Sequence, residues 1–413
     1  MNRNYLFTSE SVTEGHPDKM CDIISDAILD AYIEKDPLAR VACEVTATTD
    51  IVNVMGEITS DAAVDIEGVV RRTVEEIGYA NKMFGFDAHT CTVSINVDKQ
   101  SQDISQGVNW PVESRSHASG CGNCGVCLDE MDYMKIIGAG DQGMMFGYAC
   151  NETKSFMPAP IYYAHRICQM LGGIRKEHVL DYLGPDGKSM ITFEYCDEIP
   201  VRVDTIVISN QHFENVPFSR MYDDIIERVI MPVIPKELMD GQTKMYINPT
   251  GRFVKGGPCA DTGLTGRKII VDTYGGMGRH GGGAFSGKDP TKVDRTGAYA
   301  ARYVAKNIVA AKLADRCEVQ IAYAIGMANP VSINVNTFGT SQMDNGKITQ
   351  MVNDVFDLRP AALIERFDMR KPIYRELAVY GHMGRDDLQV NWEMTDKVNE
   401  ITNYTGDYRT RPK

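Results

Sequence analysis

The chain has 413 residues, of which 43% are hydrophobic and 24% charged, a composition typical of folded globular proteins with two or three domains. It carries 43 lysines and arginines against 56 acids, a net charge of −13, which argues against nucleic acid as a partner because phosphate binding needs a basic surface. The sequence has no apolar run long enough for a membrane span and no apolar stretch of a secretory signal at its start, so we expect a cytoplasmic protein without membrane contact.

The first predicted unit runs from Pro17 to about residue 78. Apolar residues at helical spacing follow Pro17, and two stretches of strand-like alternation follow at 41–47 and 51–58. A second helical pattern then ends at Gly78, a residue type that often terminates helices. The predicted order of elements is therefore helix, strand, strand, helix.

Two later stretches repeat this order. The second copy has predicted helices at 164–171 and 222–230 around strands at 190–195 and 201–209, and the third has helices at 296–313 and 348–356 around strands at 318–325 and 331–338. We expect an α+β fold of three similar domains, each with helices on one sheet face and the other face packed against another domain or subunit.

The predicted division of the chain follows these units. Residues 1–100 form an N-terminal α+β domain, 101–137 an extended loop with a cysteine-rich insertion, 138–255 a middle α+β domain, and 256–413 a C-terminal α+β domain. The region 101–137 is polar and rich in serine, glycine and cysteine, and a loop of that length is usually functional or mobile.

The eleven cysteines fall into two classes. Eight stand singly in apolar-patterned segments and are predicted to be reduced and buried: Cys21, Cys43, Cys91, Cys150, Cys168, Cys196, Cys259 and Cys317. Cys121, Cys124 and Cys127 are spaced as ligands for zinc or an iron–sulfur cluster, with His117 as the candidate fourth ligand. The alternative is a glycine-rich loop with incidental thiols.

The segment 252–316 is locally basic, with twelve lysines and arginines against five acids, which indicates a polyanionic ligand. It contains Gly281–Asp289, a glycine-rich stretch that leads into a helix and carries Lys288. Backbone N–H groups of such a loop can bind phosphate oxygens, and the helix N-terminus adds positive potential. The stretch satisfies the P-loop pattern until Asp289, which stands where that pattern needs serine or threonine. A structural turn and another type of phosphate loop are the remaining interpretations.

Two shorter motifs are candidates for the same site. Glu14–Lys19 opens the first helix, with Pro17 and Asp18 suited to a first helical turn. His16 and Asp18 can alternatively act at the helix mouth, one as a phosphate donor and the other as a magnesium ligand. Gly138–Gly143 is predicted to be a tight turn.

In this order, the motifs resemble the S-adenosylmethionine synthetase (methionine adenosyltransferase) family. The matching stretches are Phe7–Asp18, Gly138–Gly143, Ile247–Phe253, Gly263–Ile269, Gly281–Asp289 and Tyr380–Arg385. The resemblance covers nearly the whole chain and implies three α+β domains related by pseudo-threefold symmetry. It also implies a homodimer or dimer of dimers whose active sites lie between subunits.

The reaction implied by the resemblance is attack of the methionine sulfur on C5′ of ATP, followed by hydrolysis of the bound triphosphate to diphosphate and phosphate. A thioether nucleophile carries no proton, so no general base is needed. The departing triphosphate gathers negative charge, which lysines, arginines and Mg²⁺ can stabilise. The resemblance also implies two Mg²⁺ per active site and one K⁺ per subunit.

The resemblance also assigns roles to individual residues. The catalytic residues would be His16, Lys188, Arg267 and Lys288, and the same four would contact ATP together with Asp186, Arg252, Phe253, Asp261, Lys268 and Ala284. Methionine would be bound by Glu57, Gln100, Asp261 and Lys292. Asp18 and Asp294 would bind Mg²⁺, and Glu44 would bind K⁺. The stretch after Gln100 is longer than in the family and carries the cysteine insertion.

Two rival functions remain open at this stage. A P-loop-like ATP-dependent phosphotransferase would need a strand directly before the glycines and a hydroxyl residue after Lys288, where Asp289 stands. A non-catalytic subunit that keeps the fold would be expected to have lost His16, Asp18, Lys188 or Lys288, and all four are present.

Overall fold

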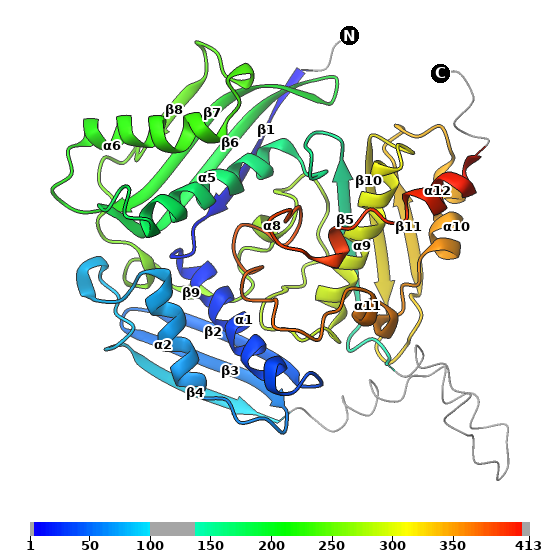
Figure 1. The fold of residues 1–413 in the computed structure, drawn as a ribbon, viewed down its shortest axis with the longest axis horizontal. Helices are drawn as coiled ribbons and strands as arrows, with labels where there is room; N and C mark the ends of the chain where they lie inside the picture. Colours follow the sequence, from blue (N-terminus) through cyan, green and yellow to red (C-terminus); the bar gives the residue numbers. More distant parts are fainter. Residues whose placement is uncertain (1–3, 100–136, 407–413) are drawn as a thin grey trace.

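The computed structural model describes residues 4–99 and 137–406. All three predicted repeats are present, each with two helices and an antiparallel strand pair (Figure 1). The first consists of α1 (Pro17–Lys35), β2 (Arg40–Thr48), β3 (Ile51–Thr59) and α2 (Ile66–Ile77). The second consists of α5 (Ala159–Lys176), β6 (Leu183–Cys196), β7 (Ile199–His212) and α6 (Phe218–Ile225), which continues through the π-helical turn Ile226–Ile230 into α7 (Met231–Val233). The third consists of α9 (Val293–Ala310), β10 (Arg316–Tyr323), β11 (Ser332–Asn336) and α10 (Asn345–Val355).

Each repeat contributes its leading strand to the sheet of another repeat. β1 (Asn4–Val12), which precedes α1, pairs antiparallel with β6 of the second repeat. β5 (Gly143–Cys150), which precedes α5, pairs with β10 of the third repeat. The short β9 (Gly263–Leu264), which precedes α9, pairs with β2 of the first repeat. This cyclic exchange ties the three repeats together, and it repeats the same topology three times.

Two further strands extend the sheets in parallel. β4 (Thr92–Asp98) lies beside β3, and β8 (Lys244–Ile247) lies beside β7. The three sheets therefore have the orders β4-β3-β2-β9, β1-β6-β7-β8 and β11-β10-β5. The remaining helices are α8 (Ile269–Asp272), α11 (Pro360–Arg366) and α12 (Val398–Tyr404), with short 3₁₀ turns at Lys82–Phe84, Lys236–Leu238, Gly257–Cys259 and Asn391–Glu393.

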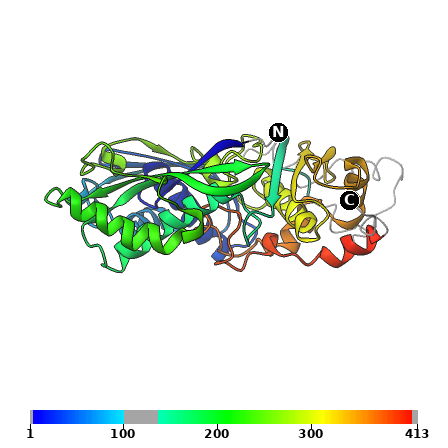
Figure 2. The same ribbon diagram turned by 90° about the horizontal axis from the view of Figure 1, so that it is seen from above.

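The sheets surround a central region that contains α8 and its flanking loops (Figure 1). Seen from above the molecule is elongated and flat, with the helices of the middle repeat along one side of their sheet (Figure 2). In each of the three sheets, alternate strand residues on the face without helices are exposed to solvent. Examples are Leu6 on β1, Glu44 on β2 and Met144 on β5. The prediction that the helices of each repeat lie on one face of its sheet agrees with this arrangement, and packing of the other face against a second subunit stays a prediction.

The hydrophobic core has two parts. One is confined to the middle repeat and includes Ile191, Phe193 and Ile206. The other is continuous through the first and third repeats and includes apolar residues of both α1 and α9. No helix among the described residues is long and apolar enough to cross a membrane. The eight single cysteines are free thiols, six of them buried, whereas Cys196 and Cys259 are partly exposed.

Candidate active site

His16 is the N-cap residue of α1, which begins at Pro17. Its ring Nδ1 accepts a hydrogen bond from the backbone N–H of Asp18 at 3.2 Å, and Pro17 occupies the first helical position. Since Nδ1 acts as an acceptor, a neutral ring carries its proton on Nε2. Burial, together with the ammonium groups of Lys268 and Lys188, lowers the pKa of His16 to about 3. The side chain is therefore an uncharged donor in a cationic environment.

Asp18 joins the start of α1 to the segment around β9. Its Oδ1 accepts the backbone N–H of Leu264 at 3.0 Å, and its Oδ2 pairs with Lys268 at 2.5 Å. The Arg267 guanidinium lies 3.7 Å from Oδ1 and is half exposed. The ammonium of Lys268 holds the pKa of Asp18 below its ordinary value, against the effect of burial. Two predicted phosphate-binding cations thus share one carboxylate.

The strand pairing of β1 with β6 brings the middle repeat to His16. Val12 lies opposite Lys188 in this pairing, and the Gly15 N–H donates to the Pro185 carbonyl at 3.2 Å. Gly15 has no room for a side chain, since a Cβ would lie 2.4 Å from Pro185. The Lys188 ammonium is close enough to contribute to the lowered pKa of His16.

Asp186 is buried next to this turn. Its Oδ2 accepts the Gly257 N–H at 2.8 Å, while its Oδ1 has no hydrogen-bond partner among residues 4–99 and 137–406. Burial raises the pKa of Asp186 to about 6. Phe253 lies close by, because a Cβ on Gly256 would approach both the Phe253 ring and the Asp186 carboxylate. A buried carboxylate oxygen without a partner, close to an aromatic ring, can accept a donor from a ligand.

The glycine-rich loop lies along the outer edge of β2. The Cys43 N–H donates to the Gly287 carbonyl at 2.9 Å, and Ala42 pairs with Lys288 as an isolated bridge. Ala42 also pairs with Glu57 on its other side. Residues directly opposite each other in a sheet point to the same face, so Lys288 and Glu57 lie on the free face with their Cα atoms roughly 10 Å apart. Glu44 is two residues from Ala42 on the same face.

The lysines of this loop are paired with carboxylates. Lys288 contacts Asp294 at 2.6 Å, and Lys292 contacts Asp289 at 2.6 Å. Asp289 also accepts the Val41 N–H and the Thr291 hydroxyl. Asp289 thus holds the loop in place through these hydrogen bonds and its ion pair with Lys292. The described residues before the glycines form turns rather than a strand, so the P-loop interpretation fails on both of its requirements.

The other predicted residues are placed as follows. Arg252 is exposed and paired with Glu214, Asp261 is exposed, and Ala284 packs against Gly266, where a Cβ would lie 2.6 Å from the Ala284 Cβ. Gln100 and the candidate metal ligands His117, Cys121, Cys124 and Cys127 lie outside the described residues. In the described part of the chain, no three His, Cys, Asp or Glu side chains form a preformed metal site.

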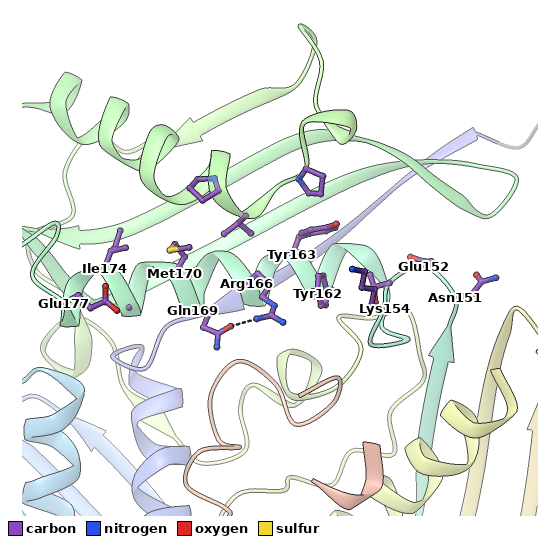
Figure 3. A pocket seen from close by; sticks show the side chains of 15 residues that line it. Asn151, Glu152, Lys154, Tyr162, Tyr163, Arg166, Gln169, Met170, Ile174 and Glu177 are labelled. Carbon is purple, nitrogen blue, oxygen red and sulfur yellow. Dashed lines mark hydrogen bonds between the residues drawn. The ribbon is translucent and has the colours of Figure 1, made fainter. Parts of the chain in front are cut away.

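A large cavity of the described structure lies elsewhere. It has a volume of about 910 Å³ and is lined by α5 and by Pro232, Val233 and Pro235. Figure 3 shows Arg166, Gln169 and Met170 of its lining along α5, with Arg166 hydrogen bonded to Gln169 at 3.2 Å. None of the predicted site residues lines this cavity. The predicted residues instead lie at the start of α1, on β2 and β3, and on the loops beside β2, with Asp186 and Lys188 on β6 and Arg252 and Phe253 after β8.

Sequence reasoning missed the residues that hold these loops in place. Lys19, Asp22, Asp26 and Arg295 are fully buried and connect α1 to the loops that carry Lys268 and Lys288. The signal that could have found them is the spacing of Asp18, Asp22, Asp26 and Asp30, which repeats every four residues and therefore lies along one side of a helix.

Comparison with known proteins matches nearly the whole chain to one family. Residues 4–102, 136–253 and 255–394 match the N-terminal, central and C-terminal domain models of S-adenosylmethionine synthetase. The chain is 60% identical to an S-adenosylmethionine synthase of Clostridium acetobutylicum over 399 residues, which cover 97% of this chain and 99% of the relative. It is 58% identical to an S-adenosylmethionine synthase of Clostridium botulinum with the same coverage. The chain therefore belongs to the S-adenosylmethionine synthetase family.

Proposed function

We propose that the protein synthesises S-adenosylmethionine from ATP and L-methionine. A lone pair of the methionine sulfur forms the S–C5′ bond, and the C5′–O bond breaks with its electron pair going to the triphosphate. The bound triphosphate is then hydrolysed to diphosphate and phosphate. The observation that carries the proposal is that His16 is bonded to Asp18, which pairs with Lys268, next to the strand pairing that brings in Lys188 and to Asp186, which has a carboxylate oxygen without a partner among the described residues.

The residues of this turn suit the departure of a polyanion. A unit charge at about 4 Å in an effective dielectric of about 20 contributes about 4 kcal/mol before desolvation. Lys188, Lys268, Arg267 and Lys288 would supply such charges to the phosphate chain, and Arg267 would also assist hydrolysis of the triphosphate. His16 would add a hydrogen bond near the breaking bond. Because its ring is neutral, it does not compete with the lysines for the negative charge of the phosphates.

The adenosine and methionine groups would be held at the edges of this region. Phe253 would stack on the adenine ring while Asp186, Arg252, Asp261 and Ala284 complete the nucleotide pocket. Glu57, with Gln100, Asp261 and Lys292, would orient the methionine ammonium and carboxylate. The position of Glu57 on the free face, opposite Ala42 and Lys288, supports this assignment.

The carboxylates fit a bridging role for Mg²⁺. This ion commonly binds one or two carboxylates and completes its coordination with phosphate oxygens and water. Asp18 and Asp294 each face one lysine ammonium, so a phosphate could take the ammonium while the carboxylate binds the ion. Mg²⁺, two per active site in our proposal, supplies charge neutralisation of the triphosphate. Glu44 would bind one K⁺ per subunit, and a zinc or iron–sulfur site at 117–127 stays a prediction.

A second copy of the chain would complete the site. Glu44, Glu57 and Lys288 belong to a sheet face that no helix within residues 4–99 and 137–406 covers. We therefore propose a cytoplasmic homodimer or dimer of dimers with active sites at the subunit interface. The division at 100, 137 and 255 is proposed for the three domains and the loop, and it is supported by the ranges of the three family models.

Product analysis tests the reaction directly. With ATP and methionine, we expect adenosylmethionine, diphosphate and phosphate in equal amounts, dependent on Mg²⁺ and increased by K⁺. Formation of ADP without adenosylmethionine would contradict the proposal and favour a phosphotransferase. Adenosylmethionine formation that persists in a chelator and without K⁺ would contradict only the ion assignments.

The pH dependence tests the state of His16. Since its pKa is lowered to about 3, the His16 ring gains no second proton between pH 8 and pH 5.5 and stays neutral. We expect kcat/KM to change by the same factor over this range in the wild type and in His16→Asn, measured at matched ion concentrations. With an ordinary pKa near 6.5, the wild type would lose roughly tenfold more at pH 5.5 than the variant, and that result would contradict the assignment.

A further inference from the structure

Four aspartates form a stripe along α1 that faces the loops of the third repeat. They are Asp18, Asp22, Asp26 and Asp30, each one helical turn after the last. Each accepts a backbone N–H from the C-terminal part of the chain: Asp18 from Leu264 of β9 (3.0 Å), Asp22 from Gly266 (2.8 Å), Asp26 from Gly287 (2.8 Å), and Asp30 from Tyr374 (3.0 Å) and Arg375 (2.8 Å). This stripe is called the aspartate ladder below.

The two middle aspartates are fully buried and carry their own counter-ions. Lys19 pairs with Asp22 at 2.7 Å and also contacts Asp272 at the end of α8. Arg295 pairs with Asp26 through both guanidinium nitrogens, at 2.8 and 2.7 Å. Both pairs are inaccessible to solvent, so the ions meet no phosphate or substrate directly. Buried ion pairs of this kind cost desolvation, and they are weak evidence for stability alone.

The loops bound by these two aspartates are those that carry the predicted cations. Gly266 directly precedes Arg267 and Lys268, and Gly287 directly precedes Lys288. Arg295 also donates to the Lys288 carbonyl at 3.1 Å, which fixes the backbone of that lysine from a second side. Within residues 4–99 and 137–406, no hydrogen bond or ion pair joins the side chains of Lys268 and Lys288 to each other. The segments that carry these two lysines share two attachments: both pair with the backbone of β2, and both donate a backbone N–H to an aspartate of α1.

We propose that Asp22 and Asp26 are positioning residues, which hold the Arg267–Lys268 segment and the Lys288 loop in fixed register on α1, and thus relative to His16. The inference rests on the proposed function, because its consequence is the placement of cations for the departing triphosphate. Asp30 also accepts backbone N–H groups from a loop, but it is only partly buried, and its loop carries none of the predicted site residues. It therefore serves as a control for the loss of a contact between α1 and a loop outside the predicted site.

Steady-state kinetics of Asp22→Asn, Asp26→Asn and Asp30→Asn in the full chain test the proposal, with melting temperatures recorded for each. Asparagine keeps the acceptor for the backbone N–H but releases the lysine or arginine. We expect kcat for adenosylmethionine formation to fall at least tenfold in the first two variants while KM for methionine changes less than threefold. Asp30→Asn keeps wild-type kinetics. The proposal would be overturned if Asp22→Asn and Asp26→Asn both folded and kept the wild-type kcat, or if Asp30→Asn lost as much kcat as they do.

A second variant covers the case in which loss of charge prevents folding. Asp26→Glu keeps the charge for Arg295 but moves the carboxylate by one methylene, so it displaces the Gly287–Lys288 backbone. We expect a folded protein with kcat reduced at least fivefold, and wild-type kcat in this variant would overturn the proposal. A wild-type protein that forms no adenosylmethionine would instead refute the proposed function, so the two failures are distinguishable.

Discussion

Replacement of His16 with alanine is expected to lower kcat for adenosylmethionine formation by about 100- to 1,000-fold. Loss of one preorganised donor to a developing anion typically costs this much. The Nε2–H of His16 is such a donor because Nδ1 is occupied by the Asp18 N–H and the ring stays neutral. Single-turnover formation of adenosylmethionine at saturating ATP and methionine measures the effect on the chemical step.

His16→Ser separates catalysis from helix capping. His16 is also the cap of α1, and loss of a cap costs about 1 kcal/mol of stability. Serine is a good cap but is too short to reach a ligand with a donor, so His16→Ser should regain the melting temperature and stay as slow as His16→Ala. If the serine variant recovers wild-type kcat, His16 acts only through the helix and its catalytic assignment is wrong.

Replacement of Lys288 with methionine is expected to reduce kcat by about 1,000-fold. The loss corresponds to one unit charge of about 4 kcal/mol next to the triphosphate. Methionine keeps most of the aliphatic volume, so the loop contacts with Val41 and Cys43 remain. Rapid-quench measurement of adenosylmethionine and triphosphate shows whether the loss falls on the first chemical step.

Lys288→Arg and Lys236→Met are the controls for this variant. Arginine keeps the positive charge and should recover at least tenfold of the lost rate, although its planar fork is not equivalent to an ammonium. Lys236 lies on a short 3₁₀ turn of the middle repeat, outside the predicted site, and its replacement should leave kcat unchanged. A Lys288→Met protein within threefold of the wild type would show that this lysine does not stabilise the departing anion.

The helices and strands of the three repeats could be predicted from the sequence because each is encoded locally. Apolar residues at helical spacing in α1 and α9, and the alternation in β2 and β3, place one face of each element in the core. The predicted positions agree with the structure within a few residues at most ends. The only strand pairs that could be predicted were those within each repeat, because consecutive strands joined by a short turn usually pair.

The exchange of β1, β5 and β9 between repeats could not be predicted in this way. β1 pairs with a strand about 180 residues later, and β9 consists of only two residues. Such pairings depend on which sheet edge is available after the repeats pack, and no local pattern records that. The Lys288 bridge to Ala42 has the same origin, so the face shared by Lys288 and Glu57 emerged only from the fold.

By itself, the sequence determined the three α–β–β–α repeats, the locally basic glycine-rich segment, and the identity of the candidate residues through their resemblance to a family. The tertiary structure decided the tautomer and neutral state of His16, the free oxygen of Asp186, and the attachment of two cationic loops to the aspartate ladder. The physical reason is that hydrogen bonding and desolvation depend on atoms brought together from distant parts of the chain. Residue type and spacing specify which groups are present, and only the packed fold determines what each group faces.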